Sequence, residues 1–288
     1  MSLIRFENVN YIYGQHTAFE KQALKNISFS IEKGSFIGLI GHTGSGKSTL
    51  IQHMNGLLLP TEGKVYFHDK DISAEGSKKK DLCASVGLVF QYPEYQLFEV
   101  DVLRDVAFGP KNLGLSKEEA ENRAKEALQM VGMDESQYLK SPFELSGGQK
   151  RRAAIAGVLA MKPEVIILDE PAAGLDPRSK QEILDMIQHL HEETGMTVIL
   201  SSHSMEDMAL YARRLIVMDQ GEVVMDGTPE EIFREYHYLE TIGLSAPQMT
   251  YIMHALADKG YPVRTDILTV QEAAWEILKL WRNSSNDT

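Results

Sequence analysis

Cysteine is almost absent from the sequence, and long apolar runs and an excess of basic residues are missing altogether. With Cys83 as the only cysteine, no internal disulfide can form, which suits a reducing compartment. No apolar run approaches the roughly 18 to 20 residues that span a bilayer, and the first residues lack the charged-then-apolar pattern of a secretion signal. From these absences we expect a cytoplasmic protein that reaches a membrane only through a partner.

The charge of the chain excludes one class of partner. Its 29 basic and 41 acidic residues give a formal net charge of −12, whereas a general nucleic-acid binder carries a basic footprint. We therefore expect no nucleic-acid partner. With 288 residues, the chain has room for one large domain or two smaller ones and can bury a substantial core.

Residues 41–49 read Gly-His-Thr-Gly-Ser-Gly-Lys-Ser-Thr and carry the clearest chemical signal. They follow an apolar run at residues 35–40 that predicts a strand, and they lead into residues 50–54, which predict a helix. In this context the pattern G-x-x-x-x-G-K-[ST] predicts a phosphate-binding loop. Backbone N–H groups and the positive end of the helix attract the anion. Lys47 reaches the outer phosphates, and the Ser48 hydroxyl can ligate Mg²⁺.

All nine residues of this phosphate loop are expected to contact the nucleotide: Gly41, His42, Thr43, Gly44, Ser45, Gly46, Lys47, Ser48 and Thr49.

A pair of acidic residues complements the phosphate loop. Asp169 and Glu170 follow the apolar run 165–168, which predicts a buried strand. Asp169 is placed to hold Mg²⁺ through water, opposite Ser48, while Glu170 points elsewhere and can accept a proton from an attacking water. The two motifs together predict hydrolysis of a nucleoside triphosphate.

Strands and helices alternate along most of the chain, which predicts an α/β fold with a mainly parallel sheet and ligands at the carboxyl ends of its strands. A helical pattern from about residue 100 to 140 is inserted between strands and suggests a subdomain attached to the nucleotide core. The expected strands cover residues 3–9, 24–31, 35–40, 64–68, 85–90, 165–168 and 197–200, with a hairpin at 215–218 and 222–225.

Residues 145–149, Leu-Ser-Gly-Gly-Gln, predict a second anion site, because two glycines stand at the start of a helix. One phosphate-loop domain needs only one such site. The second is explained if it covers the γ-phosphate of a nucleotide held by another subunit. With this motif, residues 3–228 resemble an ATP-binding-cassette ATPase.

The resemblance implies the fold and the domain division. It implies an α/β P-loop NTPase, with a RecA-like core, an antiparallel β subdomain and a helical signature subdomain at about residues 92–163. The ATP-binding domain would cover residues 1–228, and residues 229–288 would form a small C-terminal helical extension, with dimerisation as its expected role. Ser146 and Gly148 would act on ATP across a head-to-tail dimer that holds two ATP molecules.

Further residues take roles from the same resemblance. Tyr13 matches the aromatic residue that stacks on adenine, with Tyr11 as the competitor. Gln91 matches the residue that senses Mg²⁺ and the attacking water, and His203 matches a switch histidine that contacts the γ-phosphate. Asp176 lies in a loop matching one that crosses the dimer. Ala-Gly stands before Leu175 there, where many relatives have Ser-Ala.

A narrower resemblance comes from the phosphate loop, from residues 89–98 and 107–112, and from the C-terminal extension. These are similar to ATPase subunits of energy-coupling-factor transporters, which import vitamins and cobalt or nickel. The stretch after the phosphate loop, Gln-His-Met-Asn, resembles the second of two ATPase paralogues. The resemblance implies a second ATPase subunit, in a heterodimer rather than a homodimer, together with a transmembrane coupling subunit and a substrate-binding membrane subunit. The chain would then lie peripherally on the cytoplasmic face of the membrane.

Other classes fit less well. Residues between Ser48 and Leu145 are too few for the long coiled coil of a chromosome-maintenance ATPase, and a translation factor would carry two cassettes. A metabolic kinase would not need the 145–149 motif. An ordinary ABC importer or exporter subunit remains the alternative.

In the extension, we expect one helical face to pack against its own domain or against a partner, through Val270, Ala274, Ile277, Leu278 and Trp281.

Overall fold

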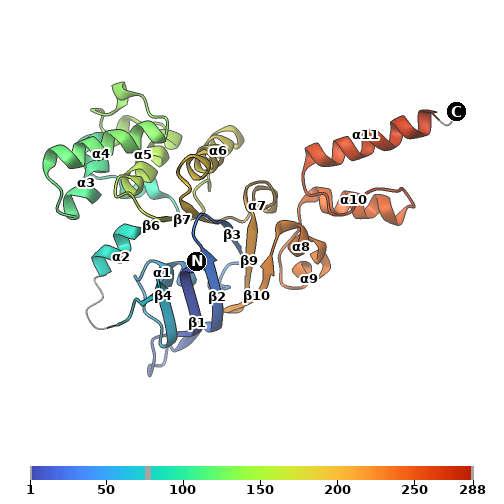
Figure 1. Cartoon of the computed structure of the whole chain (residues 1–288), viewed down its shortest axis with the longest axis horizontal. Coiled ribbons are helices and arrows are strands. Elements are labelled where there is room, and N and C mark those ends of the chain that lie inside the picture. Colours follow the sequence, from blue (N-terminus) through green and yellow to red (C-terminus); the bar gives the residue numbers. More distant parts are fainter. Residues whose placement is uncertain (1, 75–78, 287–288) are drawn as a thin grey trace.

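The computed structural model describes residues 2–74 and 79–286, with side chains through Leu280 in the last helix. Figure 1 shows a central sheet with a group of helices at one end and two further helices extending from the other end. The antiparallel sheet lies below the central sheet in that view. The arrangement confirms the predicted α/β class.

The central sheet has six strands in the order β10-β9-β3-β8-β7-β6. All neighbours are parallel except β9 and β10, which form the predicted hairpin. Its strands are β3 (Phe36–Ile40), β6 (Val86–Val89), β7 (Val165–Asp169), β8 (Thr197–Ser201), β9 (Arg214–Asp219) and β10 (Glu222–Gly227). The structure therefore contains the mainly parallel sheet that the sequence predicted.

Successive residues of the central strands enter two different cores, as the two-residue period of a strand requires. On β8, Val198 and Leu200 pack with the helices of one face, whereas Ile199 packs with the antiparallel sheet and the helix after the phosphate loop on the other. Since both faces are covered, these strands read as continuous apolar runs rather than as alternating ones. Packing on both faces holds the strands in place, and the site lies at their carboxyl ends.

The second sheet is antiparallel, in the order β2-β1-β4-β5. Its strands are β1 (Ser2–Tyr13), β2 (Lys21–Glu32), β4 (Glu62–Phe67) and β5 (Lys70–Asp71). The first two are longer than predicted, because residues 11–13 continue the ladder opposite residues 21–24 after irregularities in register. Aromatic and β-branched side chains favour this extension, which brings Tyr13 to the phosphate loop.

Helices α3 to α5 form the group at one end of the central sheet (Figure 1). They share a core of small residues, including Ala120, Ala124 and Ala153, which allow the helices to approach closely. Ser116 and Glu119 form a capping box at the start of α4. Helices of the chain up to β9 are α1 (Lys47–Met54), α2 (Lys79–Ser85), α3 (Val102–Asn112), α4 (Lys117–Met130), α5 (Gly147–Leu159), α6 (Pro177–Thr194) and α7 (Met205–Tyr211), with short 3₁₀ helices η1 (Pro93–Gln96), η2 (Glu135–Gln137) and η3 (Pro142–Glu144).

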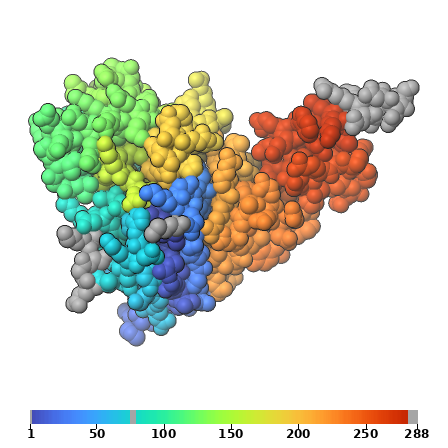
Figure 2. Space-filling model, in the orientation of Figure 1, coloured from blue at the N-terminus to red at the C-terminus, as the bar shows by residue number. Residues whose placement is uncertain are grey.

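Beyond β10 the chain is helical, with α8 (Pro229–Arg234), α9 (Tyr236–Thr241), α10 (Gln248–Asp258) and α11 (Val270–Asn286). In Figure 2 the last two helices project from the body as a separate lobe. No helix within the described ranges is both long and apolar enough to cross a membrane.

The face of α11 that we expected to pack is exposed. Val270, Ile277 and Leu278 retain 63%, 40% and 50% of their accessible surface, and Ala274 is also exposed. The buried positions of α11 are instead Ala273 and Glu276. The small Ala273 lets α11 pack against Met253 of α10 and against Ile267 of the segment between the two helices. Packing of the predicted stripe against its own domain is therefore wrong for these four residues, and the side chain of Trp281 lies outside the described part.

Candidate nucleotide-binding site

The phosphate loop, residues 41–49, joins the end of β3 to the start of α1, as predicted. Gly41 and Gly46 allow the backbone to approach its neighbours closely. A Cβ on Gly41 would lie 2.5 Å from the Met218 carbonyl oxygen, and one on Gly46 would lie 2.8 Å from that of Ala23. The loop is therefore pressed between β9 and β2 at positions where other residues would not fit.

Lys47 lies within the curve of this loop. Its Nζ donates to the carbonyl oxygens of Gly41 at 2.6 Å and His42 at 3.1 Å. Burial lowers the pKa of the Lys47 ammonium, while the nearby carboxylates of Glu170 and Asp169 act to raise it. The loop's own carbonyls therefore accept hydrogen bonds from this cation.

Asp169 lies at the end of β7 and faces the phosphate loop. Its Oδ2 accepts a hydrogen bond from Ser48 Oγ at 3.4 Å, and its Oδ1 accepts one from Ser201 Oγ at 2.5 Å. Ser201, at the end of the neighbouring strand β8, is fully buried. The sequence analysis gave Ser201 no role. Its position at the end of the strand that follows Asp169 could have indicated one, because the carboxyl ends of parallel strands lie at the same edge of the sheet.

Glu170 is the meeting point of the predicted catalytic residues. Its Oε2 accepts from Gln91 Nε2 at 2.9 Å, and its Oε1 lies 2.7 Å from His203 Nε2. The backbone of Glu170 has φ of 51°, which is strained for this residue type. Two contacts from Ser201 hold that conformation, because the Glu170 N–H donates to the Ser201 carbonyl and to its hydroxyl. The structure thus brings together three residues from three separate strand ends.

Tyr13 and Tyr11 differ in exposure. Tyr13 is 39% exposed and its hydroxyl lies 3.2 Å from Thr49 Oγ1. Tyr11 is half-buried and packs edge-on against both Tyr13 and the buried His53. Because a stacking platform needs a free ring face, this arrangement favours Tyr13 for contact with the base and gives Tyr11 a supporting position.

A pocket of about 710 Å³ lies beside the phosphate loop, a size that suits a small-molecule ligand. The predicted site residues that line it are Tyr13, Thr43, Gly44, Gly46, Lys47, Ser48, Thr49, Gln91, Asp169, Glu170 and His203. Gly41, His42 and Ser45 do not line it, and Ser45 is completely buried beneath the loop. Sequence reasoning missed the remaining lining residues from β2 and the β9–β10 turn: Lys21, Gln22, Ala23, Lys25, Gln220 and Gly221.

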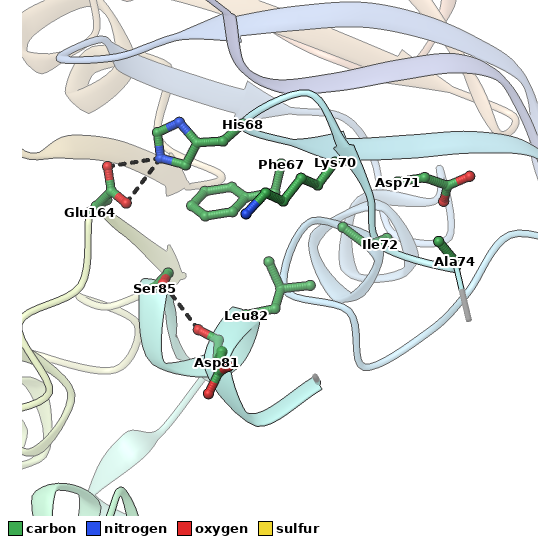
Figure 3. Close-up of a pocket in the computed structure, with 10 residues that line it drawn as sticks. All are labelled: Phe67, His68, Lys70, Asp71, Ile72, Ala74, Asp81, Leu82, Ser85 and Glu164. Atoms are coloured by element: carbon green, nitrogen blue, oxygen red, sulfur yellow. Dashed lines mark hydrogen bonds and ion pairs between the residues drawn. The ribbon is translucent and has the colours of Figure 1, made fainter. Parts of the chain in front are cut away.

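Cavity size alone does not identify this site. A cavity of about 720 Å³ lies beside β4, β5 and α2 (Figure 3). None of the described residues lining it is a glycine, and His68 Nε2 lies there 3.0 Å from both carboxylate oxygens of Glu164. Among its described lining residues there is no counterpart of the glycine-rich phosphate loop.

The signature motif, residues 145–149, does not reach the pocket of its own chain. Ser146 caps α5 in a capping box with Gln149, as its N-cap position favours, and it is exposed. Gly148 has open space above it, with Ser179 Oγ 4.0 Å from an added Cβ. Asp176 caps α6, and hydrogen bonds from Ser179 hold the pKa of its carboxyl below the usual range. None of these three lines the pocket just described.

A buried arginine, which sequence reasoning missed, connects these loops. Arg151 is 1% exposed and forms two hydrogen bonds with Glu94, at 2.6 and 3.1 Å. Its Nη1 also donates to the carbonyl oxygens of Pro171 and Ala173, both at 2.8 Å. One guanidinium thus joins the signature helix α5, the loop after Gln91 and the loop after Glu170.

The geometry matches a known family. Residues 24–173 match the ABC transporter family, and they include the phosphate loop, the signature motif and Glu170. The chain belongs to the ABC transporter family, whose fold and ATP-hydrolysing activity it shares.

Similar proteins narrow the assignment. The energy-coupling factor transporter ATP-binding protein EcfA2 of Clostridium tetani is 54% identical over 285 residues, covering 99% of each chain. EcfA2 of Caldanaerobacter subterraneus subsp. tengcongensis is 54% identical over 283 residues, covering 98% of this chain and 99% of the relative. Within the family the chain is therefore an ATPase of the energy-coupling factor group, and the predicted resemblance to the second paralogue is confirmed.

Solved structures agree. CbiO1 from Clostridium perfringens, described as part of an ABC transporter complex, has a TM-score of 0.75 and 38% identity and covers 89% of this chain and 99% of its own. MJ0796, a dimeric ATP-binding cassette in a post-hydrolysis state with ADP and Pi, has a TM-score of 0.69 and 31% identity and covers 78% of this chain and 98% of its own.

Proposed function

We propose that this chain drives an energy-coupling-factor importer of vitamins or transition-metal ions by binding and hydrolysing MgATP in pockets shared between two ATPase subunits. The observation that carries the proposal is the division of the site. Lys47, Asp169 and Glu170 converge on one pocket, while the exposed Ser146 and the half-buried Gly148 do not line it. A second subunit, paired head to tail, would bring its own signature motif over the pocket.

The residues around Ser48 fit a magnesium ion. Mg²⁺ prefers hard oxygen ligands, often one or two from the protein together with water and substrate phosphates. Ser48 and Asp169 offer such oxygens 3.4 Å apart, and the amide of Gln91 offers another. Among the described residues, no group of three or more His, Cys, Asp or Glu could hold a metal ion alone. This composition favours an ion that arrives with the nucleotide.

Glu170 is the proposed general base. Its carboxylate is partly buried and is oriented by Gln91 on one oxygen and His203 on the other. A positioned base of this kind contributes about 10²- to 10⁴-fold to a rate. His203 would contact the γ-phosphate, Lys47 would neutralise the outer phosphates, and Tyr13 would stack on adenine, with the other residues of the phosphate loop cradling the phosphates.

The paired subunit would supply the opposite half of each pocket. Ser146 and Gly148 would cover the γ-phosphate held by the partner, and Asp176 would lie at the crossing between the chains. The dimeric state of MJ0796 supports this arrangement. Because the relatives carry the name EcfA2, we propose a paralogous ATPase rather than a second copy as the usual partner.

An aromatic surface near Gln91 is the proposed contact with the membrane subunit. Tyr92, Tyr95 and Phe98 retain 40%, 83% and 60% of their accessible surface. Asp105 of α3 anchors the end of this loop by accepting hydrogen bonds from the N–H groups of Phe98 and Glu99, both at 2.8 Å. Movement of Gln91 on hydrolysis would thus be passed to the helical group and to a transmembrane coupling subunit.

We propose three parts for the chain: an ATP-binding domain at residues 1–228, its helical subdomain at about 92–163, and an extension at 229–288 that pairs the subunits. The exposed apolar face of α11 supports the last role.

A coupling subunit and a substrate-binding subunit would reside in the membrane, with this chain peripheral on its cytoplasmic face. Service in an ordinary ABC importer or exporter is the alternative, and the aromatic loop and the extension argue against it.

Replacement of Glu170 by Gln tests the catalytic half of the proposal. Because Gln keeps the size and loses the basicity, ATP should still bind while turnover falls about 10²- to 10⁴-fold. Equilibrium binding and phosphate release would be measured on the purified transporter. Glu164→Gln, outside the pocket, is the matched control and should turn over normally. Normal turnover by Glu170→Gln would remove the assigned base.

A second experiment tests the coupling surface. Tyr92→Ala with Phe98→Ala should reduce uptake in reconstituted vesicles while basal ATP hydrolysis continues, because neither residue lines the nucleotide pocket. Phe143→Ala, at an aromatic residue of η3 that is 76% exposed, is the control. Undiminished uptake by the double variant would take the loop out of the coupling path.

A further inference from the structure

His53 lies in α1, four residues beyond the end of the phosphate loop, and its side chain is completely buried. It belongs to residues 52–55, Gln-His-Met-Asn, the stretch by which the chain resembles the second ATPase paralogue. None of these four described residues lines the nucleotide pocket. The imidazole nevertheless contacts Thr49 and Tyr11, and each of these contacts Tyr13.

The contact between His53 and Thr49 is a hydrogen bond. A carbonyl oxygen only accepts, so Nδ1 of His53 donates to the Thr49 carbonyl, one turn earlier in α1, at 2.7 Å. The hydroxyl of the same threonine lies 3.2 Å from the hydroxyl of Tyr13. Thr49 is also the last residue of the phosphate loop and lines the nucleotide pocket. One threonine therefore connects the buried histidine, the phosphate loop and the tyrosine that is proposed to stack on adenine.

The contact between His53 and Tyr11 is between rings. Their centroids lie 4.7 Å apart and their planes meet at 75°, while Tyr11 meets Tyr13 at 4.8 Å and 88°. Edge-on pairs of this kind favour one relative orientation of the rings, in addition to the area that they bury. The orientation of the Tyr13 ring thus depends on a second ring that His53 itself supports.

The four contacts form a closed network that runs from His53 through Thr49 to Tyr13, and from Tyr13 through Tyr11 back to His53. A leucine at position 53 would fill a similar volume, but it would supply neither the hydrogen bond nor the aromatic ring. Because the network joins the Tyr13 ring to the phosphate loop, it sets the separation between the two.

We propose that His53 is a positioning residue for the adenine ring of ATP. Through Thr49 and Tyr11 it holds the Tyr13 ring at a fixed place beside the phosphate loop, so that the base and the phosphates bind together. The inference rests on the proposed stacking of Tyr13 on adenine. Because His53 does not line the pocket, its replacement should weaken only the part of the affinity that depends on the base.

A comparison of ATP with inorganic tripolyphosphate isolates that part, because tripolyphosphate carries the phosphates without the base. The dissociation constants of both, with Mg²⁺, would be measured by calorimetry on the full chain. For His53→Leu we expect ATP to bind about three- to ten-fold more weakly, as for the loss of an aromatic pair, and tripolyphosphate to bind as before. An equal change for both ligands, or no change for ATP, would overturn the proposal.

Tyr11 offers a second variant at a position that is only half-buried, in case His53→Leu does not fold. Tyr11→Leu should show the same selective loss of ATP affinity, whereas Tyr11→Phe keeps the ring and should bind both ligands as the wild type does. If Tyr11→Leu lost affinity for both ligands equally, the network would support the fold alone and the proposal would fail.

A matched control is available in His191, which has the same two kinds of contact outside the nucleotide pocket. Its ring lies edge-on to Phe36 with centroids 5.3 Å apart, and its Nδ1 lies 2.8 Å from the carbonyl oxygen of Met196. His191→Leu should therefore leave the ratio of the two dissociation constants unchanged. If it lowered ATP affinity selectively, as His53→Leu is expected to do, the effect would not come from the network and the proposal would be overturned.

Tyr13→Ala separates the inference from the proposed function. It should weaken ATP binding about ten-fold or more, as the loss of base stacking does, and the addition of His53→Leu should then cause no further loss. A further loss of full size would show that His53 acts elsewhere and would overturn the inference. If Tyr13→Ala left ATP affinity unchanged, the proposed stacking and the inference would fail together. If Tyr13→Ala alone weakened ATP binding, while His53→Leu and Tyr11→Leu did not, only the inference would fail.

Discussion

The phosphate loop and the signature motif are both glycine-rich starts of helices, but they differ in what surrounds them. The phosphate loop is pressed against β2 and β9, and Lys47 within it is only 7% exposed. The signature motif has open space above Gly147 and an exposed Ser146. The first is surrounded by its own chain, whereas the second lies at the surface of the chain. The comparison supports the proposal that nucleotide binding needs one chain and that hydrolysis needs two.

Ser146→Arg should have the largest effect of the variants that separate the two motifs, because it should reduce hydrolysis without reducing ATP binding. The bulky cation would block the surface that covers the partner's γ-phosphate, so hydrolysis should fall by about 10²-fold or more, as for the loss of a transition-state contact. ATP binding to the single chain should stay unchanged. Lys47→Ala is the contrast, because it should lose ATP binding itself. Equal loss of binding in both variants would place the two motifs in one pocket.

Arg151→Met tests the connection between the two regions. Removing the guanidinium leaves Glu94 and two carbonyl oxygens without their buried partner, which should reduce the free energy of unfolding by about 3 kcal/mol. Denaturant titration measures this change. Arg178→Met removes an exposed ion pair with Glu182 and should cost less than about 1 kcal/mol. A similar small cost for Arg151→Met would remove its assigned role.

Ser201→Ala tests the support beneath the catalytic pair. The change deletes the hydroxyl that donates to Asp169 and accepts from the Glu170 N–H. The Glu170 N–H keeps the Ser201 carbonyl and Asp169 keeps Ser48 as a partner. Loss of the two bonds to the hydroxyl should therefore cost about 1 kcal/mol, and hydrolysis should decrease while ATP binding persists. Ser202→Ala, one residue along and outside this network, serves as the control in thermal unfolding and activity assays. Matching results for the two variants would contradict the network.

Leu278→Glu should have the smallest effect on the lone chain. Because this side chain is half exposed, the free energy of unfolding should change by no more than about 0.5 kcal/mol. Pairing of subunits should weaken, as sedimentation would detect, if the face of α11 is covered by a partner. Gln271→Glu adds the same charge to the same helix at an exposed position and should leave pairing intact. Pairing that survives both changes would argue against the extension as a dimer contact.

Much of the fold could be predicted because its signals are local. The buried strands β3, β7 and β8 are continuous apolar runs, and the capping boxes at Ser116 and Thr269 form as their spacing predicts. The length of β1 could not be predicted, because residues 11–13 become strand only through their pairing with β2. For the stripe on α11, packing against its own domain was wrong and packing against a partner stays a prediction, since apolar periodicity does not say whether the cover belongs to the same chain.

The candidate site was predictable where chemistry and position agree. Lys47, Glu170 and His203 each follow a strand whose end lies at the same edge, so the sequence indicated their convergence. Ser201 and Arg151 were missed because a buried serine or arginine acquires its role from partners that are distant in the sequence. Contacts such as His53 with Tyr11 require the three-dimensional arrangement of α1 beside β1.

The most direct test of the shared pocket is the mass of the Glu170→Gln chain in solution. With ATP and Mg²⁺, and with its partner ATPase supplied, it should form a stable pair, and ADP should leave the subunits separate. Adding Ser146→Arg to the same chain should weaken the pair. A Glu170→Gln chain that stays strictly monomeric with ATP, alone and with every companion cassette offered, would contradict the account.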